Sequence, residues 1–383
     1  MKNSLMSTYA FLDVVIAKGD GVYLYDTKGN KYLDFTSGIG VNSLGYNNSK
    51  WTEAIINQVT RLQHCSNIFL NPVTVDLSNK LTSLAKMDKV FFANSGAEAN
   101  EGALKIARKY SFDKNGPGKN KILSLKQSFH GRTLATLTAN GQEKFHQYFF
   151  PFPEGFDYVE ANDLEDFKNK ATDDVCAIIM ESIQGEGGIH PLTKEFVQGV
   201  AKICKEKDIV LIFDEVQSGL ARTGKLFGYN HFDVEADIVT VAKGLGAGLP
   251  IGAVLANKNL SSVFTPGDHG TTFGGNPVVC AGSLVVLDEI CNEESYKRIT
   301  KINDIIKKKI AEANLNEVVE VRGMGLMIGI EIKGNSSDIQ KKAISKGLLL
   351  LTAGPNVVRL LPPLVISEKE ILEGIDILIN VLK

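Results

Sequence analysis

The sequence has little of what marks disulfide-stabilised, zinc-binding or membrane proteins. Its five cysteines are scattered over 383 residues without a C-x-x-C pair, so we expect reduced thiols and no metal site. No apolar run approaches the roughly 18 residues that a membrane helix needs, and the N-terminus lacks a signal-peptide pattern. These absences predict a soluble, cytoplasmic protein that makes no membrane contact.

Charge and composition exclude further classes of protein. The 42 Lys and Arg residues nearly balance the 44 Asp and Glu residues, which leaves a net charge of −2 and no general attraction to nucleic acid. A content of 44% hydrophobic and 22% charged residues is close to the globular average, unlike that of a disordered, collagen-like or coiled-coil chain. Small molecules are therefore the expected partners.

The order of apolar runs predicts an α/β fold with a mostly parallel sheet and helices on both of its faces. The expected strands are residues 90–92, 121–125, 177–180, 209–213, 238–241 and 251–255. A hairpin is expected at 22–35, and a long helical region, one strand at 321–332 and a final helix follow Gly275. We expect an N-terminal hairpin segment (1–47) that packs with a small C-terminal domain (276–383), and a large domain (48–275) between them.

Two charged residues directly follow apolar strands, at the sheet edge where ligands bind in open parallel sheets. Asp214 follows the run 209–213, and Lys243 follows 238–241 and precedes a glycine-rich stretch. A helix N-cap is the plain alternative for Asp214, and a surface lysine is the alternative for Lys243. A lysine nucleophile would need its pKa lowered from about 10.4 by burial or nearby cations.

Two further segments each have both a structural and a functional interpretation. Ser95 and Glu98 form an S-x-x-E capping box at the start of a helix expected at 96–110, and the amides of Ser95, Gly96 and Ala97 would also suit a phosphate. In Ser128-Phe129-His130-Gly131-Arg132-Thr133, Phe129 could stack on a flat ring and Arg132 could bind a carboxylate, although an ordinary polar loop has the same composition.

Two glycine patterns do not support a nucleotide site. Residues 219–225 match G-x-x-x-x-G-K, but Leu226 stands where a P-loop has Ser or Thr, and the pattern does not directly follow its strand. Residues 244–248 read G-x-G-x-G without the third spaced glycine of a dinucleotide fingerprint.

A lysine nucleophile, a strand-end acid, a phosphate cradle and an aromatic stacker together suit pyridoxal 5′-phosphate. The sequence closely resembles the class III, ornithine-type aminotransferases over nearly its whole length. The resemblance lies in the motifs NSGAEANEGALKIARKY, SFHGRT, ESIQGEGG, IFDEVQSGLARTGKL, VAKGLGAGLPIGA, GTTFGGNP and RLLPPLVI. It implies a fold-type I transferase that uses pyridoxal 5′-phosphate.

The resemblance also implies a role for each matching residue. Lys243 would bind the cofactor covalently, and the cofactor contacts would come from Asp214 at the ring nitrogen, Gln217 at the ring hydroxyl, Phe129 on the ring, and Ser95, Gly96 and Ala97 at the phosphate. Thr272 would reach the phosphate of the neighbouring subunit, which implies a homodimer with shared sites. Substrate contacts would come from Arg132 with Thr271, from Arg359 with its paired acid Glu186, and from Tyr9.

The implied reaction moves the δ-amino group of N2-acetylornithine to 2-oxoglutarate, giving N-acetylglutamate 5-semialdehyde and glutamate in arginine biosynthesis. The alternatives within the class are free ornithine, succinylornithine and 4-aminobutyrate as donors. Gly38 stands where a tyrosine aligns in ornithine enzymes, which favours an acylated donor, whereas Tyr9 aligns with a tyrosine that contacts free ornithine. A non-enzymatic cofactor-binding protein would be expected to lack Lys243 or Asp214, and both are present.

Overall fold

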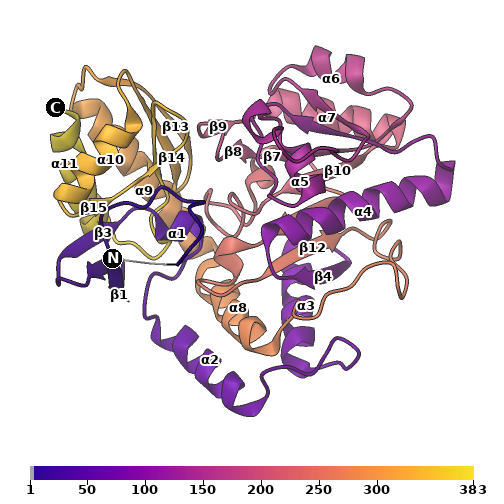
Figure 1. Cartoon of the computed structure of the whole chain (residues 1–383), viewed down its shortest axis with the longest axis horizontal. Coiled ribbons are helices and arrows are strands. Elements are labelled where there is room, and N and C mark those ends of the chain that lie inside the picture. Colours follow the sequence, from indigo (N-terminus) through magenta and orange to yellow (C-terminus); the bar gives the residue numbers. More distant parts are fainter. Residues whose placement is uncertain (1–3) are drawn as a thin grey trace.

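The computed structural model describes residues 4–383, and Figure 1 shows two parts side by side. One part is built around a seven-stranded sheet, and the other combines strands and helices from both ends of the chain. The ends meet because β3 (Lys31–Asp34) pairs in parallel with β15 (Leu348–Leu349). A hairpin of β2 (Tyr23–Asp26) and β3 forms at the expected place, and β1 (Ile16–Asp20) adds a third strand.

The larger sheet has the strand order β4-β12-β11-β10-β7-β5-β6. Its strands run parallel except β12, which is antiparallel to both neighbours, so the expected mostly parallel sheet is confirmed. The strands are β4 (Lys89–Ala93), β5 (Lys121–Leu125), β6 (Phe156–Val159), β7 (Val175–Glu181), β10 (Val210–Asp214), β11 (Ile238–Val241) and β12 (Gly252–Ala256). The sequence did not predict β6, because Asp157 interrupts its short apolar run.

The helices of the described chain range from a single irregular turn to 20 residues. They are α1 (Ser37–Gly40), α2 (Ser49–Arg61), α3 (Pro72–Ala85), α4 (Gly96–Asn115), α5 (Leu134–Ala139), α6 (Leu164–Lys170), α7 (Lys194–Lys207), α8 (Pro277–Ile290), α9 (Glu293–Glu312), α10 (Ser336–Ser345) and α11 (Glu368–Leu382). Three short 3-10 turns lie at η1 (Glu143–Phe145), η2 (Gly228–His231) and η3 (Lys243–Leu245). Helix α4 is five residues longer than the expected 96–110.

Side chains that alternate along the central strands pack against helices on opposite faces of the sheet. Ile178 of β7 belongs to the hydrophobic cluster that contains Phe196 of α7, and Ile179 belongs to the cluster that contains Ile106 of α4. All seven residues of β7 and all five of β10 are buried. Burial on both faces confirms the layered α/β arrangement and leaves only the strand ends open to a ligand.

The prediction of one strand at 321–332 is wrong. The chain turns at Gly325, which has φ 55, and forms the hairpin β13 (Val318–Met324) and β14 (Met327–Ile332). The turn contains no Asn-Gly or Asp-Gly pair, so apolar residues continue through it and conceal it in the sequence. The hairpin belongs to the sheet β13-β14-β17-β16, with β16 (Leu351–Thr352) and β17 (Val357–Leu360), and β8 (Ile183–Gln184) pairs separately with β9 (His190–Pro191).

All five cysteines are free, and four of them are buried. Within residues 4–383, no helix combines the length and the apolar character needed to cross a membrane. The same residues contain no group of three or more His, Cys, Asp or Glu side chains placed to hold a metal ion.

Candidate active site

Three neighbouring parallel strands carry polar residues in one row at or next to their carboxyl ends. Asp214 of β10 is in register with Glu181 of β7 on one side and with Thr240 of β11 on the other. Parallel strands present their carboxyl ends at the same edge, so the sheet brings these side chains together. Lys243 follows directly after β11 and lies at the same edge.

The carboxylate of Asp214 is held by three hydrogen bonds. Its Oδ2 accepts from Asn100 Nδ2 at 2.7 Å and lies 2.8 Å from His130 Nδ1, and its Oδ1 accepts from the Val216 amide at 3.0 Å. Thr240 Oγ1 donates to Asn100 Oδ1 at 2.7 Å and so fixes the orientation of that amide. Asp214 is only 4% exposed, and these contacts compensate for burying its charge.

Lys243 has an uncommon backbone conformation and an ammonium group with a lowered pKa. Its φ of 41° lies in the left-handed region, which residues other than glycine adopt uncommonly. Burial lowers the pKa of Lys243, and the charge of Arg359 lowers it further, while Asp214, Glu186 and Glu181 act in the opposite direction. A lysine that loses its proton more easily is suited to nucleophilic and base chemistry.

Arg359, on β17, reaches across to the loops of the larger sheet. Its Nη1 donates to Glu186 Oε1 at 2.9 Å and to the carbonyl of Gly185 at 3.1 Å, and it lies 3.5 Å from Gln217 Oε1. Arg359 is 3% exposed, and its Nε is buried without a hydrogen-bond partner. The structure therefore pairs Arg359 with Glu186 next to Gln217 and leaves one donor available.

Helix α4 begins at the same sheet edge, where Ser95 is exposed and Gly96 and Ala97 are half-buried. Ser95 Oγ accepts from the Glu98 amide at 3.2 Å, but the Glu98 carboxylate binds Asn94 and not the Ser95 amide, so only half of the expected capping box forms. The first-turn amides of Gly96 and Ala97 have no acceptor within the helix. A Cβ on Gly96 would lie 2.7 Å from Val216 Cγ1, so glycine lets the loop after β10 approach the helix start closely.

Phe129 and Arg132 lie together on the loop after β5. The Arg132 guanidinium carbon is 5.4 Å from the Phe129 ring centre and 4.4 Å from the Phe145 ring centre. The two rings meet edge to face, with centres 5.6 Å apart. The ring of Phe129 is half-buried and Arg132 is exposed, so the arginine is available to an anionic ligand.

Glu181 joins this loop to the one that carries Glu186. Its Oε1 accepts from the Phe129 amide at 2.9 Å, and its Oε2 accepts from the Gly185 amide at 3.1 Å. Burial raises the pKa of Glu181 to about 7, and the neighbouring Asp214 adds to the shift. One carboxyl group thus links the backbone beside the aromatic ring to the backbone beside the Arg359–Glu186 pair.

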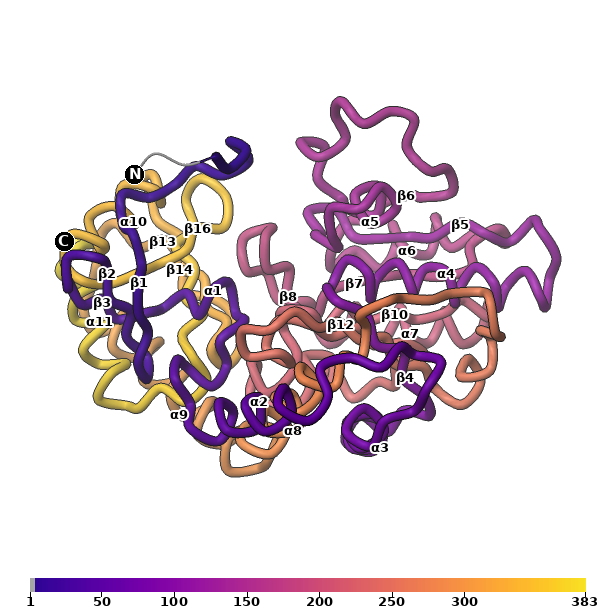
Figure 2. Tube along the Cα trace, turned by 60° about the horizontal axis from the view of Figure 1, so that its bottom comes forward, coloured from indigo at the N-terminus to yellow at the C-terminus, as the bar shows by residue number. Residues whose placement is uncertain are grey.

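The remaining candidates lie at the margin of this cluster. Thr271 is half-buried, and its Oγ1 accepts from Asn94 Nδ2 at 3.2 Å, whereas Thr272 is exposed. Tyr9 is 76% exposed, and its ring centre lies 6.5 Å from that of Phe11. Figure 2 shows the N-terminal segment and the loop before β6 on the same side of the molecule, one on each part. Within residues 4–383, no side-chain hydrogen bond joins Tyr9 or Thr272 to the cluster.

Four residues of the cluster had no assigned role in the sequence analysis: Asn100, His130, Glu181 and Thr240. A signal was present for His130, since it stands between Phe129 and Gly131 in a segment already singled out. Asn100 is a polar residue on the buried face of α4, and Glu181 ends an apolar run as Asp214 does. An acid that ends a buried strand can therefore be identified from sequence, but its side-chain partners cannot.

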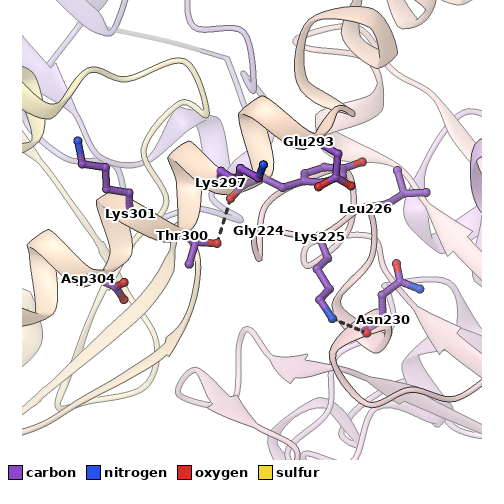
Figure 3. Close-up of a pocket in the computed structure, with 10 residues that line it drawn as sticks. Gly224, Lys225, Leu226, Asn230, Glu293, Lys297, Thr300, Lys301 and Asp304 are labelled. Atoms are coloured by element: carbon purple, nitrogen blue, oxygen red, sulfur yellow. Dashed lines mark hydrogen bonds between the residues drawn. The ribbon is translucent and has the colours of Figure 1, made fainter.

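A solvent-open pocket of about 630 Å³ lies apart from these residues, between α9 and the loop that leads to η2 (Figure 3). Its lining includes Lys225, the last residue of the G-x-x-x-x-G-K pattern, whose Nζ donates to the carbonyl of Asn230 at 2.9 Å. No α-helix begins at Lys225, in contrast to a P-loop. The lining contains none of the candidate residues.

Residues 6–382 match the model of the family described as aminotransferase class III. The chain belongs to this family. Class III aminotransferases use pyridoxal 5′-phosphate and have the fold-type I architecture, so the expected family, fold and cofactor are confirmed.

Similar proteins are acetylornithine aminotransferases from several organisms. The protein from Caldanaerobacter subterraneus subsp. tengcongensis is 48% identical over 384 residues, covering 100% of this chain and 98% of that protein. The protein from Aquifex aeolicus is 45% identical over 99% of both chains.

Solved structures of class III enzymes superpose on nearly the whole chain. The ornithine aminotransferase of Toxoplasma gondii has a TM-score of 0.95 at 31% identity, covering 99% of this chain and 92% of that one. The N-acetylornithine aminotransferase of Stenotrophomonas maltophilia has a TM-score of 0.86 at 34% identity, with 96% and 95% covered.

The residues at the sheet edge fit the cofactor of this class III aminotransferase. Lys243 has a lowered pKa, and the carboxylate of Asp214 is fixed and buried at the end of a central strand. The first-turn amides of α4 provide donors for a phosphate. A Cβ at position 252 would collide with the carbonyl of Ser95, so β12 can approach the start of α4 this closely only because residue 252 is glycine. The chemistry of these groups matches an amine, a ring-nitrogen and a phosphate contact.

Proposed function

We propose that the chain transfers the δ-amino group of N2-acetylornithine to 2-oxoglutarate, giving N-acetylglutamate 5-semialdehyde and glutamate. The observation that carries the proposal is the 2.9 Å contact between Arg359 and Glu186 beside Lys243. Because Glu186 neutralises the charge of Arg359, the site can accept a donor whose reacting end bears no carboxylate. The relatives support the choice of donor, since those at 42–48% identity over nearly the full length are acetylornithine aminotransferases.

The cofactor residues keep the roles that the family motifs imply. Lys243 would bind pyridoxal 5′-phosphate covalently, and Asp214 would accept a hydrogen bond from the ring nitrogen and so keep that nitrogen protonated. Phe129 would stack on the ring, and Gln217 would contact the ring hydroxyl. The phosphate would be held by the backbone at the start of α4, from Ser95, Gly96 and Ala97, and by Thr272 of a second copy of the chain.

When bound, pyridoxal 5′-phosphate supplies the electron sink that stabilises the carbanion formed at the donor carbon. The Nζ of Lys243 would take the proton from the amine-bearing carbon of the donor, a role that its lowered pKa favours. Asn100 and His130 would keep the Asp214 carboxylate oriented while charge develops next to it.

Two arginines would divide the substrates between them. Arg132, exposed beside Phe129 and near Thr271 in the motif alignment, would hold the single carboxylate of N2-acetylornithine, and Tyr9 would be a further substrate contact. Arg359 would bind the α-carboxylate of 2-oxoglutarate or glutamate after Glu186 turns away from it. Bidentate binding of a carboxylate by a planar guanidinium favours arginine at both positions.

Free ornithine is the second candidate donor. The structural similarity to the Toxoplasma gondii ornithine aminotransferase, with a TM-score of 0.95, favours it, as does the alignment of Tyr9. An α-ammonium group beside the carboxylate would then need a partner in the pocket.

A homodimer with shared sites is part of the proposal. Apolar side chains are exposed next to Thr272 and on the segment that follows Asn67: Phe273 is 62% exposed, and Ile68, Phe69 and Leu70 are 86%, 66% and 90% exposed. Asn67 Nδ2 donates to the carbonyls of Thr271 and Gly274 at 3.0 Å, which joins the two segments into one patch. Exposed apolar patches of this kind mark protein interfaces. The five free cysteines support a reducing, cytoplasmic setting.

Separate measurement of the two half-reactions tests the division of labour. Replacing Arg359 with Lys should impair mainly the half-reaction with 2-oxoglutarate, whereas Arg132→Lys should impair mainly the half-reaction with N2-acetylornithine. Glu186→Gln should slow the acetylornithine half-reaction more than the other, because Arg359 loses its partner when the donor is bound. Equal losses in both half-reactions for the Arg359 variant would contradict the proposal.

A further inference from the structure

Arg222 is a fully buried arginine that forms no salt bridge among residues 4–383, and the charge of the buried Asp34 only partly offsets the effect of burial on its pKa. It lies within the G-x-x-x-x-G-K pattern that the function leaves unexplained, and it is 2% exposed. Among residues 4–383, no carboxylate oxygen lies within 4 Å of its guanidinium, and burial lowers the pKa of Arg222. Burying an unpaired cation is unfavourable unless hydrogen bonds compensate for the lost water.

Both side-chain hydrogen bonds of Arg222 reach the other part of the molecule. Its Nη1 donates to the carbonyl of Pro362 at 2.6 Å and to the carbonyl of Leu326 at 3.1 Å. Its own carbonyl accepts from the Leu326 amide at 2.8 Å. Pro362 comes three residues after Arg359 of β17, and Leu326 lies in the turn between β13 and β14.

The backbone on both sides of this contact is specialised for it. Leu220 and Ala221, directly before Arg222, have φ values of 54° and 70°, which two successive non-glycine residues rarely adopt. On the other side, a Cβ on Gly325 would lie 2.5 Å from the carbonyl oxygen of Arg222. The loop after β10 and the hairpin turn therefore meet at a fixed and close distance.

The same loop carries residues of the candidate site. It directly follows Asp214, the last residue of β10, and contains Gln217, whose Oε1 lies 3.5 Å from Arg359 Nη1. Arg222 and Gln217 also line a cavity of about 10 Å³ together with Gly244, the residue after Lys243. Any change in the contact between Arg222 and Pro362 would thus move Arg359 relative to Gln217 and Lys243.

We propose that Arg222 is a positioning residue for Arg359: by holding the carbonyls of Pro362 and Leu326, it fixes β17 against the loop that carries Gln217. The inference rests on the proposed role of Arg359 in binding the α-carboxylate of the acceptor. Arg222 itself touches neither substrate nor cofactor in this account.

Arg298 of α9 provides a matched control. Like Arg222, it donates to two backbone carbonyls of the segment after β17, those of Leu364 at 2.5 Å and Ile366 at 3.1 Å. It is half-buried, and among the described residues its side chain forms no hydrogen bond with the loop after β10. Arg298→Met therefore removes a similar tie without releasing Arg359 from Gln217.

The test measures binding of glutarate, a dicarboxylate that cannot react, to the cofactor-loaded protein by calorimetry. We expect Arg222→Met to weaken glutarate binding at least tenfold, Arg222→Lys to weaken it three- to tenfold, and Arg298→Met to change it less than threefold. The KM for 2-oxoglutarate should rise in parallel in the Arg222 variants, while the rate of the acetylornithine half-reaction changes less than threefold. Thermal unfolding midpoints should fall in all three variants.

A loss of less than threefold in folded Arg222→Met, or an equal loss in Arg298→Met, would overturn the inference, because Arg222 would then contribute only to stability. If Arg222→Met does not fold, Arg222→Lys is used instead, and a loss of glutarate affinity of less than threefold in that variant would overturn the inference. Failure of the unaltered protein to bind glutarate would instead overturn the role of Arg359, and with it the proposed function as well as this inference.

Discussion

Asp214 and Glu181 lie in register on the neighbouring central strands β10 and β7, yet their surroundings differ. Asp214 accepts hydrogen bonds from the side chains of Asn100 and His130, whereas Glu181 accepts only from the amides of Phe129 and Gly185. Burial raises the pKa of Glu181 to about 7. The two adjacent acids thus lie in different surroundings, and burial brings the pKa of Glu181 close to neutral pH.

The raised pKa of Glu181 predicts a specific dependence of stability on pH. The folded chain binds this proton more tightly than the unfolded chain, whose pKa is near 4.5, so this group's contribution to stability falls as pH rises from about 4.5 to about 7. Glu181→Gln removes the ionisable group and therefore the fall in stability that this group causes as pH rises. The unfolding midpoint of Glu181→Gln minus that of the unaltered protein should therefore increase between pH 5 and pH 8.

Glu195→Gln, at an exposed acid in the first turn of α7, serves as the control and should give a difference that varies little over the same range. A constant difference for Glu181→Gln as well would show that Glu181 is ionised throughout.

The sequence was sufficient for the parts of the fold that depend on local pattern. The strand at residues 238–241 and the start of α4 at Gly96 agree with the structure, because a short apolar run and a capping serine are local signals. The turn at Gly325 was missed, since the glycines of this apolar stretch include no Asn-Gly or Asp-Gly pair to mark a hairpin. The domain limits at residues 47 and 275 stay predictions.

The site could be predicted only in part, for a physical reason. Asp214 and Lys243 were found because a charge at the end of an apolar strand needs an explanation. The contacts of Asp214 with Asn100 and His130 join residues 114 and 84 positions apart, so they depend on the packing of α4 and the loop after β5 against the sheet. The roles of Tyr9 and Thr272 stay predictions.

The attachment of the cofactor can be assigned chemically. Borohydride reduction of the cofactor-loaded protein followed by peptide mapping should place a pyridoxyl label on Lys243, the lysine whose pKa burial lowers. Lys225, at the end of the G-x-x-x-x-G-K pattern, should stay unlabelled. A label on Lys225 or on any other lysine would refute the assignment.

The role of Asp214 predicts a loss of turnover without a loss of cofactor. An adjacent carboxylate favours a protonated ring nitrogen by about one to three pKa units, and Asp214→Asn removes that charge. The variant should retain the cofactor spectrum while turnover falls at least a hundredfold. Asp237→Asn is the matched control, because Asp237 also lies beside a strand of the sheet and accepts from Leu211 and Asn257, but away from the site. Near-normal turnover in Asp214→Asn would refute the assigned role.

Shared sites predict complementation between two inactive chains. Mixed dimers of Lys243→Ala and Thr272→Ala chains should contain one site with both substitutions and one with neither, so activity should return when the two proteins exchange subunits. Exchange can be followed with differently tagged chains. If exchange occurs and activity does not return, Thr272 serves its own chain or the protein is not a dimer.

The choice of amino donor tests the account most directly. Single-turnover conversion of the cofactor, followed by stopped-flow absorbance, can be compared for N2-acetylornithine, free ornithine, succinylornithine and 4-aminobutyrate. Acetylation removes the α-ammonium charge beside the carboxylate that Arg132 would hold, and an unpaired buried charge costs several kcal/mol, so a preference of about a hundredfold over ornithine is expected. The account predicts that N2-acetylornithine reacts fastest, and a faster reaction with free ornithine or 4-aminobutyrate would contradict it.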